Sequence, residues 1–159
     1  MNARPVLATL ARVFQEQALE VVMIGNSAAA LHGAPVSTID IDFVFRKTPA
    51  NLQKLKRIAE GLQGVLLRPY YPVSDLYRLV RDDDGLQVDF MGTIHGMKSF
   101  EGLRSRAIRV EFDGYPLLVA DLTDIIKSKR AAGRPRDRAV LEILEQTLDE
   151  KKNLEKGEA

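Results

Sequence analysis

The sequence predicts a single-domain α/β protein of the α+β type, with a mixed β-sheet, helices packed mainly on one face, and two C-terminal helices. Three observations lead to this prediction. The chain of 159 residues is long enough for one hydrophobic core. Segments with helical periodicity alternate with segments of period two, and Asp-Gly pairs separate two pairs of strand-like segments. We expect residues 1–150 to form the domain and residues 151–159 to be a disordered tail.

The N-terminal half predicts three helices and two strands. Apolar residues at helical spacing behind Pro5 indicate a first helix before a strand at residues 21–24. A short helix should follow directly, with Ser27 as its N-cap. Thr48 and Pro49 are typical of an N-cap and first helical position, so a further helix is expected from there to about residue 61 or 64.

The C-terminal half predicts two hairpins and then two helices. Residues 76–91 form one hairpin around an Asp-Gly turn, and residues 107–119 form another around a second such turn. Asp121 then begins a helix that ends near Gly133, and Pro135 begins the last helix.

Composition excludes several classes of protein. There is no cysteine, so disulfides, thiolate catalysis and cysteine-ligated metal sites are ruled out. No apolar run approaches the roughly 20 residues that span a bilayer, so we expect a cytoplasmic protein without membrane attachment. The net charge is +1, but residues 127–138 contain six basic side chains and one acidic one. Any preference for anions must therefore come from local charge.

Two aspartates interrupt a strand that should be buried. With a period of two, Asp40 and Asp42 lie on one side, opposite the apolar Ile39, Ile41 and Phe43. Two carboxylates on one face repel each other unless they face water, a proton or a cation. The pair therefore indicates either the solvated face of a half-buried strand or a metal site.

Two further features point to a metal and a phosphate. The first strand ends in Gly25, Asn26 and Ser27, and a helix begins there at once. Such a junction can bind an anion at the helix N-terminus, but the same residues are also typical of an ordinary capped helix. Asp89 lies on the polar side of its strand, where it can join Asp40 and Asp42 if the strands are neighbours. Carboxylates beside phosphates are the usual ligands of Mg²⁺.

These residues resemble the nucleotidyltransferase superfamily with the polymerase-beta-type fold. The family pattern is an apolar residue with Gly and Gly or Ser, a short helix, Asp-apolar-Asp, and a later carboxylate. The chain has Ile24 to Asn26, then Asp40 to Asp42, then Asp89. The run "KRAAGRPRD", residues 129–137, is similar to a signature of small stand-alone bacterial members, some of them toxins of toxin–antitoxin systems. The similarity covers roughly residues 20–145, and Asn26 departs from it.

The resemblance implies an enzyme that moves a nucleoside monophosphate from an NTP to an acceptor hydroxyl and releases pyrophosphate. Asp40 and Asp42 would hold two Mg²⁺ ions, or Mn²⁺ in their place, and Asp89 would bind one ion and accept the proton. Residues 25–27 would position the phosphates. RNA such as tRNA, or protein, would be the acceptor, and a cognate antitoxin or toxin a further partner.

Two alternatives remain open at the level of sequence. Lys129 and Arg134 can contact the triphosphate or a nucleic-acid backbone, but they can also be a basic helix end. The whole protein can be an inactive nucleotide- or partner-binding module, antitoxin-like or a sensor, and Asn26 supports that reading.

Overall fold

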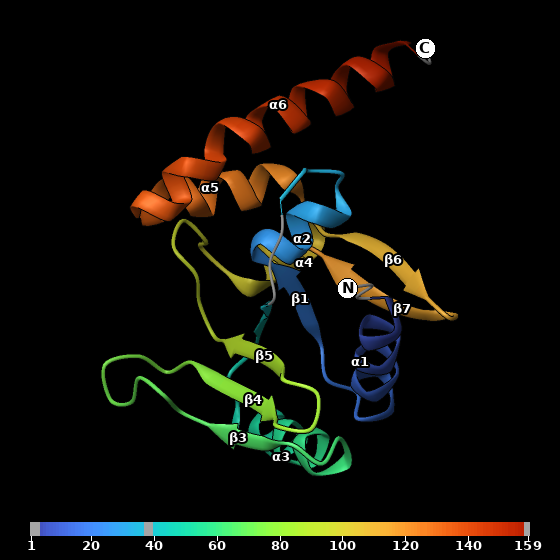
Figure 1. Ribbon diagram of the computed structural model, residues 1–159, viewed down its shortest axis with the longest axis vertical. Helices are drawn as coiled ribbons and strands as arrows, with labels where there is room; N and C mark the ends of the chain where they lie inside the picture. The colour runs from blue at the N-terminus through green and yellow to red at the C-terminus, as the bar shows by residue number, and fades with distance from the viewer. Residues whose placement is uncertain (1–3, 37–39, 158–159) are drawn as a thin grey trace.

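A computed structural model of the protein describes residues 4–36 and 40–157. These residues form a mixed seven-stranded sheet and six helices, which confirms the predicted α/β fold (Figure 1). In chain order the elements are α1 (Arg4–Glu16), β1 (Val21–Ile24), α2 (Gly25–Leu31), β2 (Ile41–Phe45), α3 (Pro49–Gly61), β3 (Val65–Leu67), β4 (Tyr77–Arg81), β5 (Leu86–Met91), α4 (Phe100–Arg106), β6 (Ile108–Phe112), β7 (Tyr115–Val119), α5 (Leu122–Ala132) and α6 (Pro135–Gly157).

The sheet has the strand order β3-β4-β5-β2-β1-β7-β6. Both predicted hairpins are present, β4 with β5 and β6 with β7, and each is antiparallel. β1 is antiparallel to β2, whereas β2 pairs in parallel with β5, and β1 in parallel with β7. Because β2 is central, residues on its polar face have neighbours on both sides.

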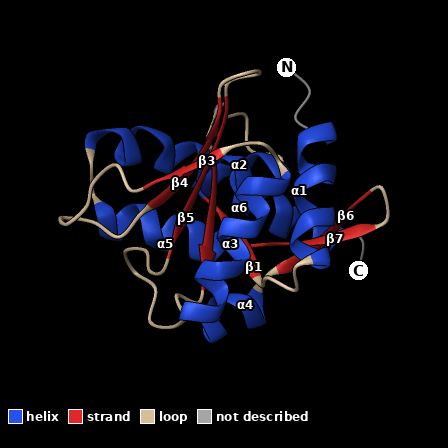
Figure 2. Cartoon of the chain, turned by 90° about the horizontal axis from the view of Figure 1, so that it is seen from below, coloured by secondary structure: helices blue, strands red, loops and turns tan. Residues whose placement is uncertain are grey.

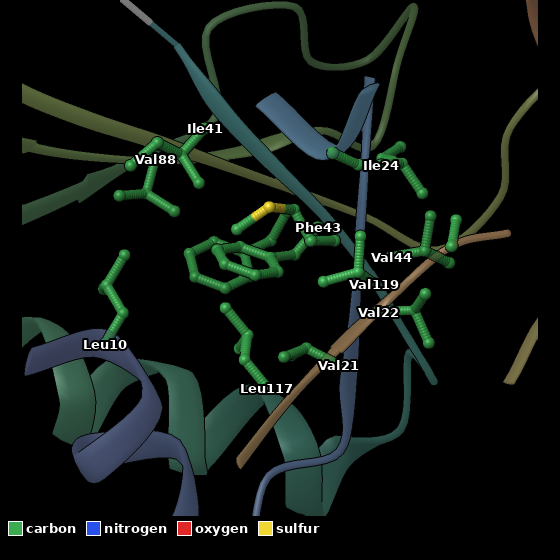
Figure 3. Packing of buried hydrophobic residues seen from close by; sticks show 14 of the residues in the cluster. Leu10, Val21, Val22, Ile24, Ile41, Phe43, Val44, Val88, Leu117 and Val119 are labelled. Atoms are coloured by element: carbon green, nitrogen blue, oxygen red, sulfur yellow. The ribbon is translucent and has the colours of Figure 1, made fainter. Parts of the chain in front are cut away.

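One face of the sheet holds the aromatic core. The rings of Phe43 and Phe90 stack with centroids 5.7 Å apart, and Phe14 of α1 meets Phe43 edge-on at 5.0 Å. Leu10 points from α1 toward the same face (Figure 3). Two views place α1 beside the β6–β7 hairpin (Figure 1 and Figure 2). The predicted alternation of β2 is therefore correct for Phe43; Ile39 lies outside the described residues.

Helix ends follow local chemistry at most positions. Thr48 caps α3 by accepting from the N–H of Asn51, and Asp121 caps α5 by accepting from the N–H of Thr123, as predicted. Gly133 ends α5 with a φ of 62°. The predicted cap at Ser27 is wrong: α2 begins at Gly25, and the Ser27 hydroxyl donates to the Ile24 carbonyl oxygen at 3.2 Å.

The structure differs from the sequence interpretation at three other places. Helix α4 and strand β3 were not expected, because each is short and lacks a clear periodic pattern. The expected disordered tail is also wrong over residues 151–157, which belong to α6. The buried Leu144 anchors this helix, and Lys151 Nζ lies 2.6 Å from His32 Nδ1, which extends its contacts beyond residue 150. Residues 158–159 lie outside the described residues.

Within the described ranges, no helix is long and apolar enough to cross a membrane.

Candidate active site

Strands β2 and β5 bring two predicted carboxylates together. Their parallel pairing sets Asp42 directly opposite Asp89, and Asp40 immediately precedes β2. Asp89 is buried. Burial, followed by the negative charges of Asp89 and Asp40, raises the pKa of Asp42 to about 6. These surroundings, in spite of the opposing charges of Lys129 and Arg78, disfavour the ionised form of Asp42, and a cation bound beside it would favour that form.

Gly25 allows the turn before α2 to approach this carboxylate closely. Its φ of +73° favours glycine, and a Cβ at this position would lie 2.9 Å from Oδ2 of Asp42. Next to it, the side-chain Oδ1 of Asn26 is buried and has no hydrogen-bond partner within the described part of the chain. Buried polar atoms are rarely left without a partner, so Asn26 is suited to a polar group brought by a ligand.

Arg78 is a site residue that the sequence interpretation missed. It lies opposite Asp89 in the β4–β5 ladder, with Nε 2.9 Å from Oδ1 and Nη2 3.1 Å from Oδ2. The sequence contains the information that predicts this pairing of Arg78 with Asp89. A hairpin that closes at Asp84 and Gly85 and pairs residue 81 with residue 86 also pairs residue 78 with residue 89.

Lys129 and Arg134 belong to one network around Asp137. This carboxylate is only 2% exposed and accepts from Nε of Arg134 at 2.6 Å and from the Arg134 N–H at 3.2 Å. Lys129 Nζ lies 3.8 Å away. Burial pushes the pKa of Asp137 upward, but the bonds and charge of Arg134 together with Lys129 outweigh it and hold that pKa below its usual value. Asp137 thus orients the two cations.

All these groups border one cleft of about 660 Å³. Its lining includes Gly25, Asn26, Asp40, Asp42, Asp89, Lys129 and Arg134, together with Arg78, Tyr70 and Asp137. The structure therefore brings together the predicted site residues except Ser27, which is not in the lining. This arrangement places carboxylates on one wall and cations from α5 and the following turn on another.

The three aspartates do not fit a metal ion equally well. Carboxylate oxygens are ligands that Mg²⁺ prefers, and the burial and charge around Asp42 favour a cation. Asp89, however, already binds a guanidinium with both oxygens. Among residues 4–36 and 40–157, no three His, Asp or Glu side chains are arranged as a metal-binding group. Asp40 and Asp42 fit a divalent ion better than Asp89 does.

Residues 5–157 match the family described as nucleotidyltransferase of unknown function, DUF6036. The chain belongs to this family. No curated protein matches it significantly. Membership in this nucleotidyltransferase family confirms the superfamily resemblance drawn from the aspartate and glycine motifs.

Solved structures with this nucleotidyltransferase fold are similar over most of their length. The antibiotic-resistance factor ANT(2'')-Ia, solved in complex with adenylyl-2''-tobramycin, gives a TM-score of 0.65 at 14% identity, covering 96% of this chain and 92% of that one. TM1012 from Thermotoga maritima, provisionally named a nucleotidyltransferase, gives 0.63 at 22% identity, covering 92% of each chain. An antigenic nucleotidyltransferase-like protein from Paracoccidioides brasiliensis gives 0.60 at 13% identity, covering 92% and 75%. These likenesses support the fold.

Proposed function

We propose that the protein is a metal-dependent nucleotidyltransferase that moves a nucleoside monophosphate from an NTP to an acceptor hydroxyl. One observation supports this above the others. The Gly25 turn lies against Asp42 so closely that a Cβ would come 2.9 Å from its Oδ2. A glycine turn that lines the cleft, set directly against a partly buried carboxylate, suits a metal–nucleotide site.

In this proposal Asp40 and Asp42 hold the divalent ion, Mg²⁺ or Mn²⁺. The ion would neutralise phosphate charge. Gly25 leaves room for the Asp42 carboxylate beside the cleft, and the unpartnered Oδ1 of Asn26 can accept a hydrogen bond from the nucleotide or from its water. Lys129 and Arg134, oriented by Asp137, face the same cleft and add positive charge beside the triphosphate.

The reaction is a displacement at the α-phosphorus. The acceptor oxygen forms a bond to this phosphorus, the bond to the bridging oxygen breaks, and pyrophosphate leaves with that electron pair. The hydroxyl proton passes to a carboxylate of the aspartate group. Because the chemistry needs position and charge rather than a covalent intermediate, the site needs no nucleophilic side chain.

The acceptor we propose is RNA, such as tRNA, or a protein side chain. The support is the resemblance to small stand-alone bacterial members, which also suggests a cognate antitoxin or toxin as a partner. ANT(2'')-Ia, with its adenylyl-2''-tobramycin complex, represents a small-molecule acceptor on the same fold. The acceptor must therefore be found by experiment.

A second candidate is an inactive nucleotide- or partner-binding module. The Arg78–Asp89 ion pair favours it, because both oxygens of the third carboxylate are engaged. Such a protein would bind metal and NTP without transferring a nucleotide.

Incubation with each α-labelled NTP and Mg²⁺ or Mn²⁺, in the presence of total RNA or of cell proteins, separates these candidates. We expect label on one acceptor class with the parent protein and none with Asp42→Asn. Metal-dependent NTP binding without label transfer to any acceptor would favour the binding module. A parent protein that binds no NTP would contradict both the transferase and a nucleotide-binding module, and would favour a module that binds only a partner chain.

A further inference from the structure

The Arg78–Asp89 ion pair is fixed by the sheet on one side and by an aromatic ring on the other. The two residues face each other across adjacent strands, and the guanidinium binds both carboxylate oxygens, at 2.9 Å and 3.1 Å. Only 7% of the Asp89 side chain and 22% of the Arg78 side chain are exposed. The Tyr70 ring centroid lies 5.6 Å from the guanidinium carbon. A paired, partly buried guanidinium of this kind keeps its geometry.

The charges on the two neighbouring strands are unequal. An arginine stays protonated at any physiological pH, so Arg78 cancels the charge of Asp89 permanently. Asp42 has Asp89 and Asp40 as neighbouring carboxylates, and the charges of Lys129 and Arg78 offset them only in part. Asp40 accepts from the Gln87 side-chain amide at 3.2 Å. The guanidinium bound to both oxygens of Asp89 therefore distinguishes this carboxylate from Asp42 on the neighbouring strand.

A divalent ion on Asp89 would lie within a few ångströms of the guanidinium. Two cations that share one small carboxylate repel each other strongly in a buried site. Binding a metal there would require Arg78 to break two charge-assisted hydrogen bonds and move out of its place beside Tyr70.

We propose that Arg78 takes the place of a second metal ion at Asp89, so that the protein binds one divalent ion per nucleotide, on Asp40 and Asp42. This inference rests on the proposed function. Asp89 is then the residue that positions Arg78, and the guanidinium provides fixed positive charge on that side of the cleft. Transfer would proceed with one metal ion and one arginine in place of two metal ions.

The direct test is the number of Mn²⁺ ions bound by the full-length protein. Titration with Mn²⁺ in the presence of a non-hydrolysable analogue of each NTP, followed by electron paramagnetic resonance and calorimetry, gives that number without turnover. We expect one ion for the parent, none for Asp42→Asn, and two for Arg78→Gln, in which Asp89 is released. Arg81→Gln on the same hairpin, where Arg81 pairs with the exposed Asp84, should still bind one.

A double variant covers the case in which Arg78→Gln does not fold. Arg78→Gln with Asp89→Asn replaces the ion pair by two neutral side chains, and its Mn²⁺ affinity should remain within about threefold of the parent because Asp89 is not a ligand. A tenfold or greater loss in this variant would overturn the inference, as would two ions in the parent. A parent that shows no Mn²⁺-dependent nucleotide binding would overturn the proposed function as well.

Discussion

Asp42 and Asp89 face each other in register on the parallel strands β2 and β5, but their side chains have different partners. Asp89 binds a guanidinium through both oxygens. Asp42 lies against the Gly25 turn and has Asp89 and Asp40 as its nearest carboxylates. Both aspartates lie on the polar side of a strand in the sequence pattern, but the structure gives them different partners. We therefore make separate predictions for each.

Asp42→Asn should abolish metal-dependent NTP binding. The amide removes one of the two carboxylates that we assign to the ion and leaves the triphosphate without a counter-charge on that wall. Calorimetric titration with metal–NTP would measure the loss. Asp82→Asn, in the exposed β4–β5 turn, is the matched control and should bind like the parent. Equal affinity in the Asp42 and Asp82 variants would show that the site is assigned wrongly.

The same residue should make stability depend on pH. The pKa of Asp42 is raised from 3.8 to about 6, so between these values the folded protein keeps a proton that the unfolded chain releases. Stability should therefore fall as the pH rises from about 4 to about 6, by an amount on the order of 2 to 3 kcal/mol. Urea unfolding with chelator, for the parent and Asp42→Asn, isolates this contribution. A difference between the two proteins that does not vary with pH would contradict the prediction.

Gly25→Ala should affect both folding and binding. The positive φ strains any side chain, at a cost of about 1 to 2 kcal/mol, and the new Cβ would collide with Asp42 Oδ2. Gly33→Ala is the control, because its φ is +97° but nothing lies within 4 Å of the added Cβ. Urea unfolding and NTP titration should show strain in both variants and lost binding only in Gly25→Ala. Normal binding in Gly25→Ala would exclude the turn as a phosphate site.

Lys129→Ala should weaken NTP binding by tenfold or more. The side chain is only 14% exposed, and its ammonium group borders the cleft. Removal of a desolvated cation beside a triphosphate costs more than removal of an exposed one. Lys127→Ala, two residues away on α5 and exposed, should change affinity by less than about twofold, given the small effect of screened charges. If both variants lost NTP affinity to a similar extent, Lys129 would contribute only as part of the general surface charge.

Asp137→Asn should lower the free energy of unfolding by about 1 to 3 kcal/mol. The variant weakens the buried bonds to Arg134 and frees two cations from their common partner. Asp149→Asn, exposed on the same helix, should leave stability nearly unchanged. Urea unfolding compares them, and an unaffected Asp137→Asn protein would show that the network around this carboxylate is not structural.

Much of the fold could be predicted because its signals are local. The caps at Thr48 and Asp121, the left-handed end at Gly133, and the hairpin turns at Asp84 and Asp113 depend on side chains within a few residues of the backbone they bind. The alternation in β2 likewise assigns Phe43 to the core and Asp42 to the opposite face. The interpretation of Ser27 failed because its hydroxyl bonds to Ile24 behind it.

By itself, the sequence determined most of the helices and strands, the two faces of β2 and the identity of the acidic and basic groups that could form a site. Only the tertiary structure decided which of these groups meet. The parallel pairing of β2 with β5 set Asp42 beside Asp89, and α5 brought Lys129 to the same cleft. These contacts join residues far apart in the chain, and their charges act over a few ångströms, so electrostatics of the site depend on packing that no local pattern encodes.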